Sequence, residues 1–416
     1  MSERVSDVHA QNVVDNLHLL RSITGDEQGA QRLAWTERWS DARQFLKACL
    51  AELPVRVETD EAGNIWAYLE GARSETVVIG SHLDSVPDGG WLDGAFGVMA
   101  ALEVLRALSR GERPSYTVAL VDWADEEGAR FGRSLFGSSA VTGTLDVEGA
   151  RYLVDSRGEH LPSVLGAFGV NLDGIAAAQN RLDGVIAYFE AHIEQGPVLE
   201  KAGLAVGAVL GTVGVERHRV TFHGRSAHSG STPMDRRQDP FLAAAATSLA
   251  VRDAAVRHKG VGTVGYTSIT PGIVTAVGEE AVILVDQRHL GSDGLLAMYT
   301  EAHGASLRFA EEEGCTVHWE PVLQVRPQPF DGELVRMAVK ACLEVSGQGM
   351  TLASGALHDA TEMATRVPTA MIFTSSTEGI SHNRDEDTPE ADLRAGVDAL
   401  YHLVKAWLAR SESPAD

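Results

Sequence analysis

The chain has 416 residues, 44% of them hydrophobic, which is too long for one ordinary core and predicts two domains. Its formal net charge of −23 at pH 7 argues against a nucleic acid or an anionic membrane surface as partner, because both require a basic surface. The 3 cysteines are widely spaced and form no CxxC pair, so neither a disulfide framework nor a thiolate zinc site is expected.

The amino terminus, residues 1–7, lacks the apolar stretch of a secretory signal. No run in the chain approaches the roughly 18 apolar residues that a membrane span requires. We therefore expect a cytoplasmic protein with reduced thiols and no membrane partner.

The first half of the chain alternates between helices and strands. We expect helices within residues 8–50, the second of them over Thr36–Leu50, and another over Ala95–Leu108. The predicted strands are Val55–Leu69, Thr76–Ile79, Tyr116–Trp123 and Val185–Ala191, with only loops and short helices over residues 130–183. Strand, helix and strand in this order predict an α/β domain with a doubly wound, mostly parallel sheet.

From about Val213 the pattern becomes that of a self-contained unit. The predicted elements are the strand Arg217–Phe222, the helix Pro240–His258, the strands Thr263–Ile269 and Ala281–Arg288, the helix Leu295–Glu313 and the strand Thr316–Val322. This βαββαβ order is the ferredoxin-like motif, which has two helices on one face of an antiparallel sheet. The other face of such a sheet is free for a partner.

After Arg326 the α/β pattern returns. We expect a helix over Leu334–Val345, a strand over Thr369–Phe373 and a last helix that opens at Thr388-Pro389-Glu390, with a capping residue followed by Pro at the first helical position. The catalytic domain is therefore predicted to be split into residues 1–212 and 327–416, with residues 213–326 inserted between its parts.

Histidines and carboxylates recur at the predicted strand ends, where ligands bind in open α/β sheets. They are His82, Asp93, Glu126, Glu127, His192 and His382. Imidazole and carboxylate groups without thiolates suit a catalytic zinc, manganese or similar divalent ion. Six such groups exceed what one open site needs, and a carboxylate such as Asp93 can bridge two ions.

The acidic run after the strand Tyr116–Trp123 contains two adjacent candidates, Glu126 and Glu127. In extended backbone their side chains point to opposite sides, so one can bind metal while the other acts as general base toward water. An acidic run is more often a solvated turn, but its position directly after a hydrophobic strand favours the functional interpretation. Asp84 either accepts a hydrogen bond from the ring of His82 or forms a turn, and both interpretations stay open.

The motifs taken together resemble those of the dinuclear metallo-amidohydrolases, in the branch of N-carbamoyl-L-amino acid hydrolase, β-ureidopropionase and allantoate amidohydrolase. The residues that carry the resemblance are His82-Leu83-Asp84, Asp93-Gly94, Asp125-Glu126-Glu127-Gly128, His192-Ile193-Glu194-Gln195-Gly196-Pro197, the run Gly224 to Met234, Ser354-Gly355-Ala356-Leu357-His358-Asp359-Ala360 and Ser381-His382-Asn383. They span residues 82–383, most of the chain.

The resemblance implies two divalent ions per subunit. It assigns one ion to His82, Asp93 and His192, and the second to Asp93, Glu127 and His382. It makes Glu126 the catalytic base. We also count Asp84 as a catalytic candidate, because it stands two residues after His82. The ligand set suits zinc, manganese, cobalt or nickel equally.

The resemblance also implies substrate contacts and a partner. His228, in the inserted domain, corresponds to a residue that enters the site of a second subunit and stabilises the oxyanion, so a homodimer formed through the inserted lid domain is expected. Gln195, Gly355 and Arg288 correspond to substrate-contacting positions. Arg288 is a natural partner of a substrate carboxylate, with an ordinary surface cation as the alternative.

The chain departs from the family at one segment. Where the family has an Asn-Val-Ile/Val-Pro-Gly run, whose Asn helps to bind the substrate's carboxylate end, this chain has Ile273-Val274-Thr275-Ala276-Val277-Gly278. The departure favours a related amide, ureide or biosynthetic intermediate over the usual carbamoyl amino acid.

The expected activity is hydrolysis of a linear C–N bond in an N-carbamoyl amino acid or related ureido compound by metal-activated water. The rival within catalysis is an aminoacylase or dipeptidase, which the Gln195-Gly196-Pro197 context disfavours. The rival from another class is a metal-binding pseudoenzyme. The intact Glu126 argues against it, because a binding module needs no base.

Overall fold

The computed structural model describes residues 8–410. The chain forms two compact units: unit 1 runs to Leu210 and resumes at Phe330, and unit 2 is Gly211–Pro329. The expected domain boundaries, at residues 213 and 326, lie just inside unit 2. Among the described helices, none combines the length and apolarity that crossing a membrane demands.

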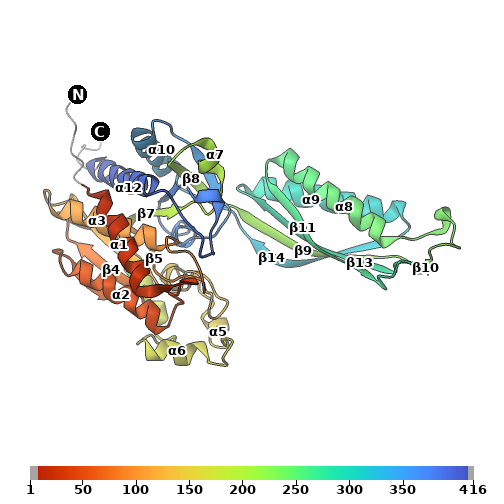
Figure 1. Ribbon diagram of the computed structural model, residues 1–416, viewed down its shortest axis with the longest axis horizontal. Coiled ribbons are helices and arrows are strands. Elements are labelled where there is room, and N and C mark those ends of the chain that lie inside the picture. The colour runs from red at the N-terminus through yellow and green to blue at the C-terminus, as the bar shows by residue number, and fades with distance from the viewer. Residues whose placement is uncertain (1–7, 411–416) are drawn as a thin grey trace. The chain divides into compact units, whose positions relative to one another are not determined.

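Strands of a nine-stranded mixed sheet form the centre of the described part of unit 1 (Figure 1). Its order is β15 (Gln328–Pro329), β8 (Val206–Thr212), β17 (Thr369–Thr374), β7 (Val185–Ile193), β5 (Arg73–His82), β6 (Tyr116–Trp123), β4 (Ile65–Leu69) and β3 (Arg56–Thr59), with β16 (Thr351–Ser354) paired to β8. The strands β17, β7, β5 and β6 are parallel, whereas β8, β4 and β3 join their neighbours antiparallel. The predicted α/β class with a mostly parallel central sheet is confirmed.

Both faces of this sheet are buried, because alternate residues of the central strands belong to two separate cores. Val77 and Ile79 face one core, and Val78 faces the other. The first core is covered by α1 (Ala10–Thr24), α3 (Ala95–Ser109), α10 (Gly332–Ser346) and α12 (Glu390–Arg410) (Figure 1). The second core is covered by α4 (Phe136–Thr142), α6 (Leu161–Ala167), η1 (Ile175–Leu182) and α11 (Asp359–Met363). Helix α2 (Glu37–Leu50) contributes to both.

The parallel strands bring their carboxyl ends to one edge of the sheet. His82, the last residue of β5, pairs with Trp123 at the end of β6, and His192 in β7 pairs with Phe373 in β17. The loops that leave these strands therefore start side by side. This register places the predicted polar residues at one edge.

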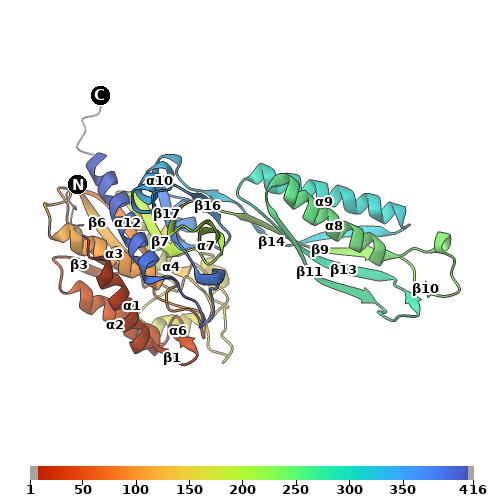
Figure 2. The same cartoon turned by 45° about the horizontal axis from the view of Figure 1, so that its top comes forward.

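Unit 2 has the expected ferredoxin-like motif. Its four-stranded antiparallel sheet has the order β11 (Val261–Thr270), β13 (Glu280–His289), β9 (Gly214–His223) and β14 (Thr316–Val325). Helices α8 (Pro240–His258) and α9 (Ser292–Glu312) lie side by side on one face of it (Figure 2). The short strands β10 (Ala227–His228) and β12 (Ala276–Val277) form a separate antiparallel pair.

Three expectations about local structure were wrong. Val55–Leu69 is not one strand but the hairpin β3–β4, because the Asp60 carboxylate accepts the backbone N–H groups of Ala62 and Asn64 and closes a turn. His192 lies inside β7 and not after it. Helix α12 begins at Glu390, and the Thr388 hydroxyl donates to the Ser375 carbonyl instead of capping the helix.

The remaining described elements are short. They are the hairpin β1 (Gly25–Asp26) and β2 (Gly29–Ala30), the helices α5 (Val147–Ala150) and α7 (Val198–Ala202), and the 3-10 turns η2 (Met234–Arg236) and η3 (Thr377–Gly379). The hairpin β1–β2 was not predicted. The short helices over residues 130–183 were expected.

Candidate metal centre

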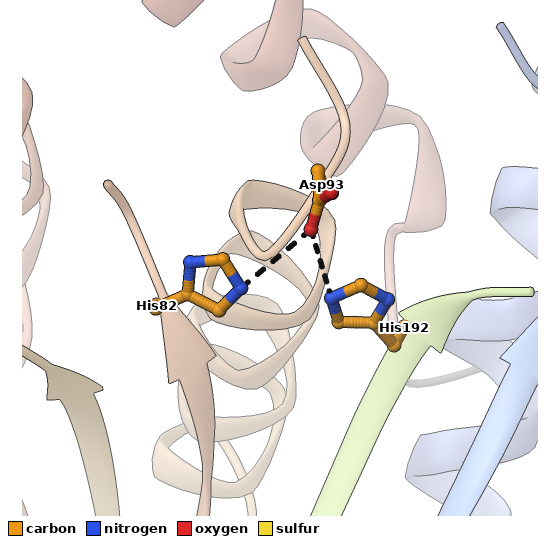
Figure 3. A group of neighbouring side chains, drawn as sticks. All are labelled: His82, Asp93 and His192. Atoms are coloured by element: carbon orange, nitrogen blue, oxygen red, sulfur yellow. Dashed lines mark ion pairs between the residues drawn. The ribbon is translucent and has the colours of Figure 1, made fainter. Parts of the chain in front are cut away.

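The first candidate ligand group consists of His82, Asp93 and His192 (Figure 3). The Asp93 Oδ1 atom lies 3.6 Å from His82 Nε2 and 3.1 Å from His192 Nε2. The two histidines project from the neighbouring strands β5 and β7, and Asp93 projects from the loop before α3 (Figure 3). All three side chains are buried. Two imidazoles and a carboxylate around one point are a common ligand set for zinc and related ions.

The second candidate group consists of Asp93, Glu127 and His382. His382 Nε2 lies 3.2 Å from Asp93 Oδ2 and 3.4 Å from Glu127 Oε2. The two oxygens of Asp93 therefore face different groups, Oδ1 the first and Oδ2 the second. Asp93 therefore offers one carboxylate oxygen to each candidate group.

The histidine rings of the first group are oriented as metal ligands require. His82 Nδ1 lies 3.1 Å from the Asp84 carbonyl, and His192 Nδ1 lies 2.9 Å from the Ile193 carbonyl. A carbonyl only accepts, so each Nδ1 carries the proton and each Nε2 presents its lone pair toward Asp93. The ring of His82 bonds the Asp84 carbonyl, since the Asp84 carboxylate is farther away, at 3.6 Å.

Gly94 explains how Asp93 fits between the rings. It adopts φ +63°, and a Cβ there would lie 2.4 Å from the ring of His82. Only glycine combines this backbone conformation with so close an approach. The helix α3 starts at the next residue, and so the Asp93 side chain projects from its amino-terminal end.

Hydrogen bonds to two buried carboxylates hold the loop that carries Glu126 and Glu127. The Asp84 carboxylate accepts the backbone N–H groups of Glu126 at 3.2 Å and of Glu127 at 3.1 Å. Asp125, which has φ +58°, accepts the indole N–H of Trp35 at 2.7 Å. These bonds hold Glu126 Oε2 3.7 Å from His82 Nε2, outside both ligand groups, while Glu127 belongs to the second.

Both ligand groups and Glu126 line one cavity of about 240 Å³ in unit 1. Its walls are His82, Asp93, Glu126, Glu127, Ser134, His192, Gln195, Ala356, Leu357, His358 and His382. The volume lies below the roughly 300–1,000 Å³ that is common for ligand pockets, so only a small molecule fits in it.

The carboxylates in this cavity are shifted toward their protonated forms. Burial raises the pKa of Glu126 well above its ordinary value; His82 opposes the shift, and the carboxylates of Asp359 and Glu127 add to it. Burial and the neighbouring Asp93 raise the pKa of Glu127 to about 7. Nearby positive charge would reverse these shifts, because it stabilises ionised carboxylates.

The histidines respond in the complementary way. Burial by itself lowers the pKa of His82, but the carboxylates of Glu126, Asp84 and Asp93 raise it well above its ordinary value. The hydrogen bond to Asp93 is the main reason that the pKa of His382 is raised to about 9, with burial opposing it. Without a metal ion, the raised pKa values mean that His82, Glu127 and His382 keep their protons to higher pH than usual.

The donor set fits a divalent metal. The buried oxygens Glu127 Oε1 and Gln195 Oε1 have no hydrogen-bond partner among the described residues. Buried acceptors without a partner are costly, and a cation or the water around it satisfies them. No thiol lies among the residues that line the cavity.

Gln195 and Gly355 are also part of unit 1. The Gln195 amide donates to Asp93 Oδ2 at 2.8 Å and to the Ser381 hydroxyl at 3.1 Å. Gly355 lies in an exposed loop directly before the cavity residues Ala356 and Leu357. Unit 1 thus contains all the predicted site residues except two.

The two others, His228 and Arg288, belong to unit 2. His228 is exposed, and its Nδ1 atom accepts the backbone N–H groups of Gly230 and Ser231, both at 3.1 Å. Arg288 donates from Nε to Asp286 at 2.8 Å.

Sequence reasoning missed several residues that shape the site. Glu386 accepts the backbone N–H groups of Leu92 and Asp93, and Ser381 donates to Asp93. His358 packs against His192 with ring centroids 4.5 Å apart. Ser381 and His358 belong to the motifs quoted above. Glu386 lies in an acidic segment that is typical of a solvent-exposed loop, and no sequence pattern distinguishes it.

Comparison with known proteins agrees with this geometry. Residues 78–406 match Peptidase family M20/M25/M40. The chain is 34% identical to the N-carbamoyl-L-amino acid amidohydrolase of Geobacillus stearothermophilus, over 92% of this chain and 94% of that protein. It is 33% identical to the allantoate amidohydrolase of Escherichia coli K12, over 95% of this chain and 98% of that protein.

A solved structure shows the same fold. An amidase of the hydantoinase/carbamoylase family from Burkholderia multivorans superposes with a TM-score of 0.86 at 31% identity, over 98% of this chain and 99% of that one. With the sequence matches, this likeness shows that the chain belongs to the M20/M25/M40 family, as an amidohydrolase of its hydantoinase/carbamoylase branch.

Proposed function

We propose that the chain hydrolyses a linear amide or ureide C–N bond, with an N-carbamoyl amino acid or a related ureido compound as substrate. One observation carries the proposal: two ligand groups share Asp93 and face, together with Glu126, a single cavity. The names of the two relatives, a carbamoyl amino acid amidohydrolase and an allantoate amidohydrolase, support this substrate class.

The proposed cofactor is a pair of divalent ions per subunit, zinc or else manganese, cobalt or nickel. His82, Asp93 and His192 would hold one ion, and Asp93, Glu127 and His382 the other. When bound, such ions polarise a carbonyl and lower the pKa of water toward neutrality.

Glu126 is the proposed base. It lies in the cavity but in neither ligand group, which leaves its carboxylate free to exchange protons. It accepts a proton from the attacking water and returns it to the leaving nitrogen as the C–N bond breaks. When a ureide is cleaved, the products are the amine, ammonia and carbon dioxide.

Several residues position this reaction. The two backbone bonds that Asp84 accepts orient Glu126 and Glu127, which supports a role of Asp84 next to the base. Gln195, Gly355 and Arg288 are the proposed substrate contacts, with Arg288 directed at a carboxylate.

His228 is proposed to stabilise the oxyanion in the site of a second subunit, in a homodimer formed through unit 2. Because Nδ1 accepts two backbone bonds, the proton of the neutral ring lies on Nε2, as a donor to an oxyanion requires. Mixing Glu126→Gln with His228→Ala tests this role, since a mixed dimer regains one intact site. A fully active monomer would contradict it.

The departure at residues 273–278 refines the substrate. The Ser229 N–H donates to the Thr275 carbonyl at 3.0 Å, and His228 pairs with Ala276. Thr275 therefore lies beside His228. Its side chain has no amide, which supports a ureide or biosynthetic amide over the usual carbamoyl amino acid.

The rivals remain an aminoacylase or dipeptidase and a metal-binding pseudoenzyme. A panel of N-carbamoyl amino acids, carbamoyl-β-alanine, allantoate, N-formyl amides and N-acetyl amides, assayed with each defined metal, distinguishes them. We expect turnover of carbamoyl or ureido compounds. Turnover of the acetyl amides alone would favour the first rival, and metal binding without any turnover would favour the second.

The cytoplasm is the proposed compartment. Cys49, Cys315 and Cys342 are all free thiols, as is usual in a reducing environment. We propose a small molecule and a second copy of the chain as its partners.

A further inference from the structure

Glu386 connects the two loops that carry Asp93 and His382. Its carboxylate is buried, and Oε1 accepts the backbone N–H groups of Leu92 and Asp93, both at 3.0 Å. Oε2 accepts the hydroxyl of Ser381, the residue before His382, at 2.7 Å. One side chain thus bonds to both loops.

The neighbouring residues fit closely around this carboxylate. A Cβ at Gly90 would lie 1.9 Å from the Glu386 carboxyl group, so only glycine permits the approach. The Trp91 indole N–H donates to the Glu386 carbonyl at 3.1 Å, and the Ser381 hydroxyl also lies within 3.2 Å of Asp93 Oδ2. The loops therefore join through Glu386 and Ser381 next to the second ligand group.

We propose that Glu386 is a positioning residue that sets the geometry of the second ligand group, Asp93, Glu127 and His382, by fixing the Asp93 backbone against the His382 loop. The inference rests on the proposed two-ion centre. His82 and His192 belong to β-strands and do not need this support, whereas His382 lies in a loop without regular secondary structure. Loss of Glu386 should therefore weaken the second ion more than the first, because the first group shares Asp93 but keeps two histidines that the strands hold in place.

Three substitutions separate geometry from charge. Glu386→Gln retains an oxygen at the same reach, and this oxygen can accept both backbone bonds. Glu386→Asp retains the charge but is shorter by one carbon–carbon bond, about 1.5 Å, so it cannot reach the N–H groups. Glu386→Leu has neither an acceptor nor a charge.

The experiment is a titration of the metal-free protein with cobalt(II) alone, followed calorimetrically. Wild type should bind two ions. Glu386→Asp and Glu386→Leu should bind the second ion about 10–100-fold more weakly, as is typical for loss of a residue that orients metal ligands, and the first ion with a clearly smaller loss. Glu386→Gln should bind the second ion more tightly than Glu386→Asp does.

Glu103→Gln is the matched control. Glu103 is equally buried and accepts the His9 N–H and the Asn12 amide, but it lies in α3 away from both ligand groups. This variant should bind both ions as wild type does. Its behaviour separates the general cost of changing a buried carboxylate from an effect on the second ion.

The outcomes distinguish the two proposals. Fewer than two ions on wild type would contradict the two-ion centre itself. Two ions on wild type and unchanged affinity in Glu386→Leu would overturn only the role of Glu386. If Glu386→Leu does not fold, Glu386→Asp and Glu386→Gln decide. The role of the hydrogen bonds is contradicted when Glu386→Asp binds the second ion as wild type does and Glu386→Gln binds it weakly, because charge then matters.

Discussion

The two candidate ligand groups share Asp93 but are supported in different ways. In the first, the histidine side chains are 1% exposed and belong to adjacent strands whose register is fixed by the central sheet. In the second, the His382 side chain is 50% exposed and its backbone adopts φ +53°, a left-handed conformation that is unfavourable for a residue other than glycine. One group is part of the core, and the other depends on side-chain contacts between loops.

The two groups therefore differ in how freely their ligand side chains can move. Moving His82 or His192 would disrupt sheet pairing and buried packing, so the two histidines of the first group are held in place before an ion binds. His382 can move with its loop at much lower cost. We therefore expect a tighter, slowly exchanging ion at the strand-end group and a weaker, exchangeable ion at the loop group.

His82→Ala should have the largest effect on this comparison. It removes a buried ligand of the tighter site, so affinity for the first ion should fall more than ~100-fold, beyond the range for orienting residues alone. Activity should be lost with it. Metal analysis and calorimetry measure the change, and His402→Ala, a surface histidine that contacts Glu344, serves as control. Two bound ions in His82→Ala would refute the assignment.

His382→Ala should remove the second ion and leave the first. Its expected loss of affinity for the second ion is again more than ~100-fold, because a direct ligand is lost. The first ion should bind within about threefold of wild type, since His82 and His192 do not depend on the His382 loop. Equal weakening of both ions would show that the two groups are not independently supported.

The pH dependence of metal-free stability should reveal the proton that His382 binds. The folded pKa of His382 is raised from 6.5 to about 9, so the folded state binds the extra proton, and its stabilising contribution is full below pH 6.5 and lost as pH rises through 9. The raised pKa of Glu127, about 7 against 4.5, acts in the same direction between pH 4.5 and 7. Denaturant unfolding of wild type and His382→Ala at pH 6 and pH 9 measures the first contribution. A wild type that loses no more stability than the variant would contradict it.

Ser381→Ala should have the smallest effect. The hydroxyl has one proton, which lies between the carboxylates of Asp93 and Glu386, and its hydrogen bond is worth about 1 kcal/mol, or roughly fivefold in affinity. The weakening should be confined to the second ion in the cobalt(II) titration. If only the first ion bound more weakly, Ser381 would support the first ligand group and not the second, contrary to this account.

Much of the fold could be predicted from sequence because the core strands are continuous apolar runs. Tyr116–Trp123 was predicted to the residue, as was the helix Pro240–His258. The hairpin β3–β4 was missed because its turn depends on the Asp60 carboxylate, whose hydrogen bonds are not visible as a pattern. Thr388 was misread since its hydroxyl has a tertiary partner, the Ser375 carbonyl, that competes with capping.

The candidate site could be predicted only in part for a related reason. His82 is the last residue of β5, His192 lies one residue before the end of β7 and Glu127 lies in the loop after β6, so the parallel-sheet rule brings them together. Glu386 and Ser381 act through contacts between loops that are distant in sequence, and local spacing contains no signal for such contacts. Arg32, which is fully buried beside Leu83 and donates to its carbonyl, was likewise not predicted.

Glu126→Gln tests the central claim most directly, because it removes the proposed base and leaves both ligand groups intact. The variant should retain the full metal content of wild type, measured per chain, while turnover of the best carbamoyl or ureido substrate falls about 10²–10⁴-fold, the usual contribution of a general base. Wild-type turnover in a fully metal-loaded Glu126→Gln protein would contradict the proposed hydrolysis.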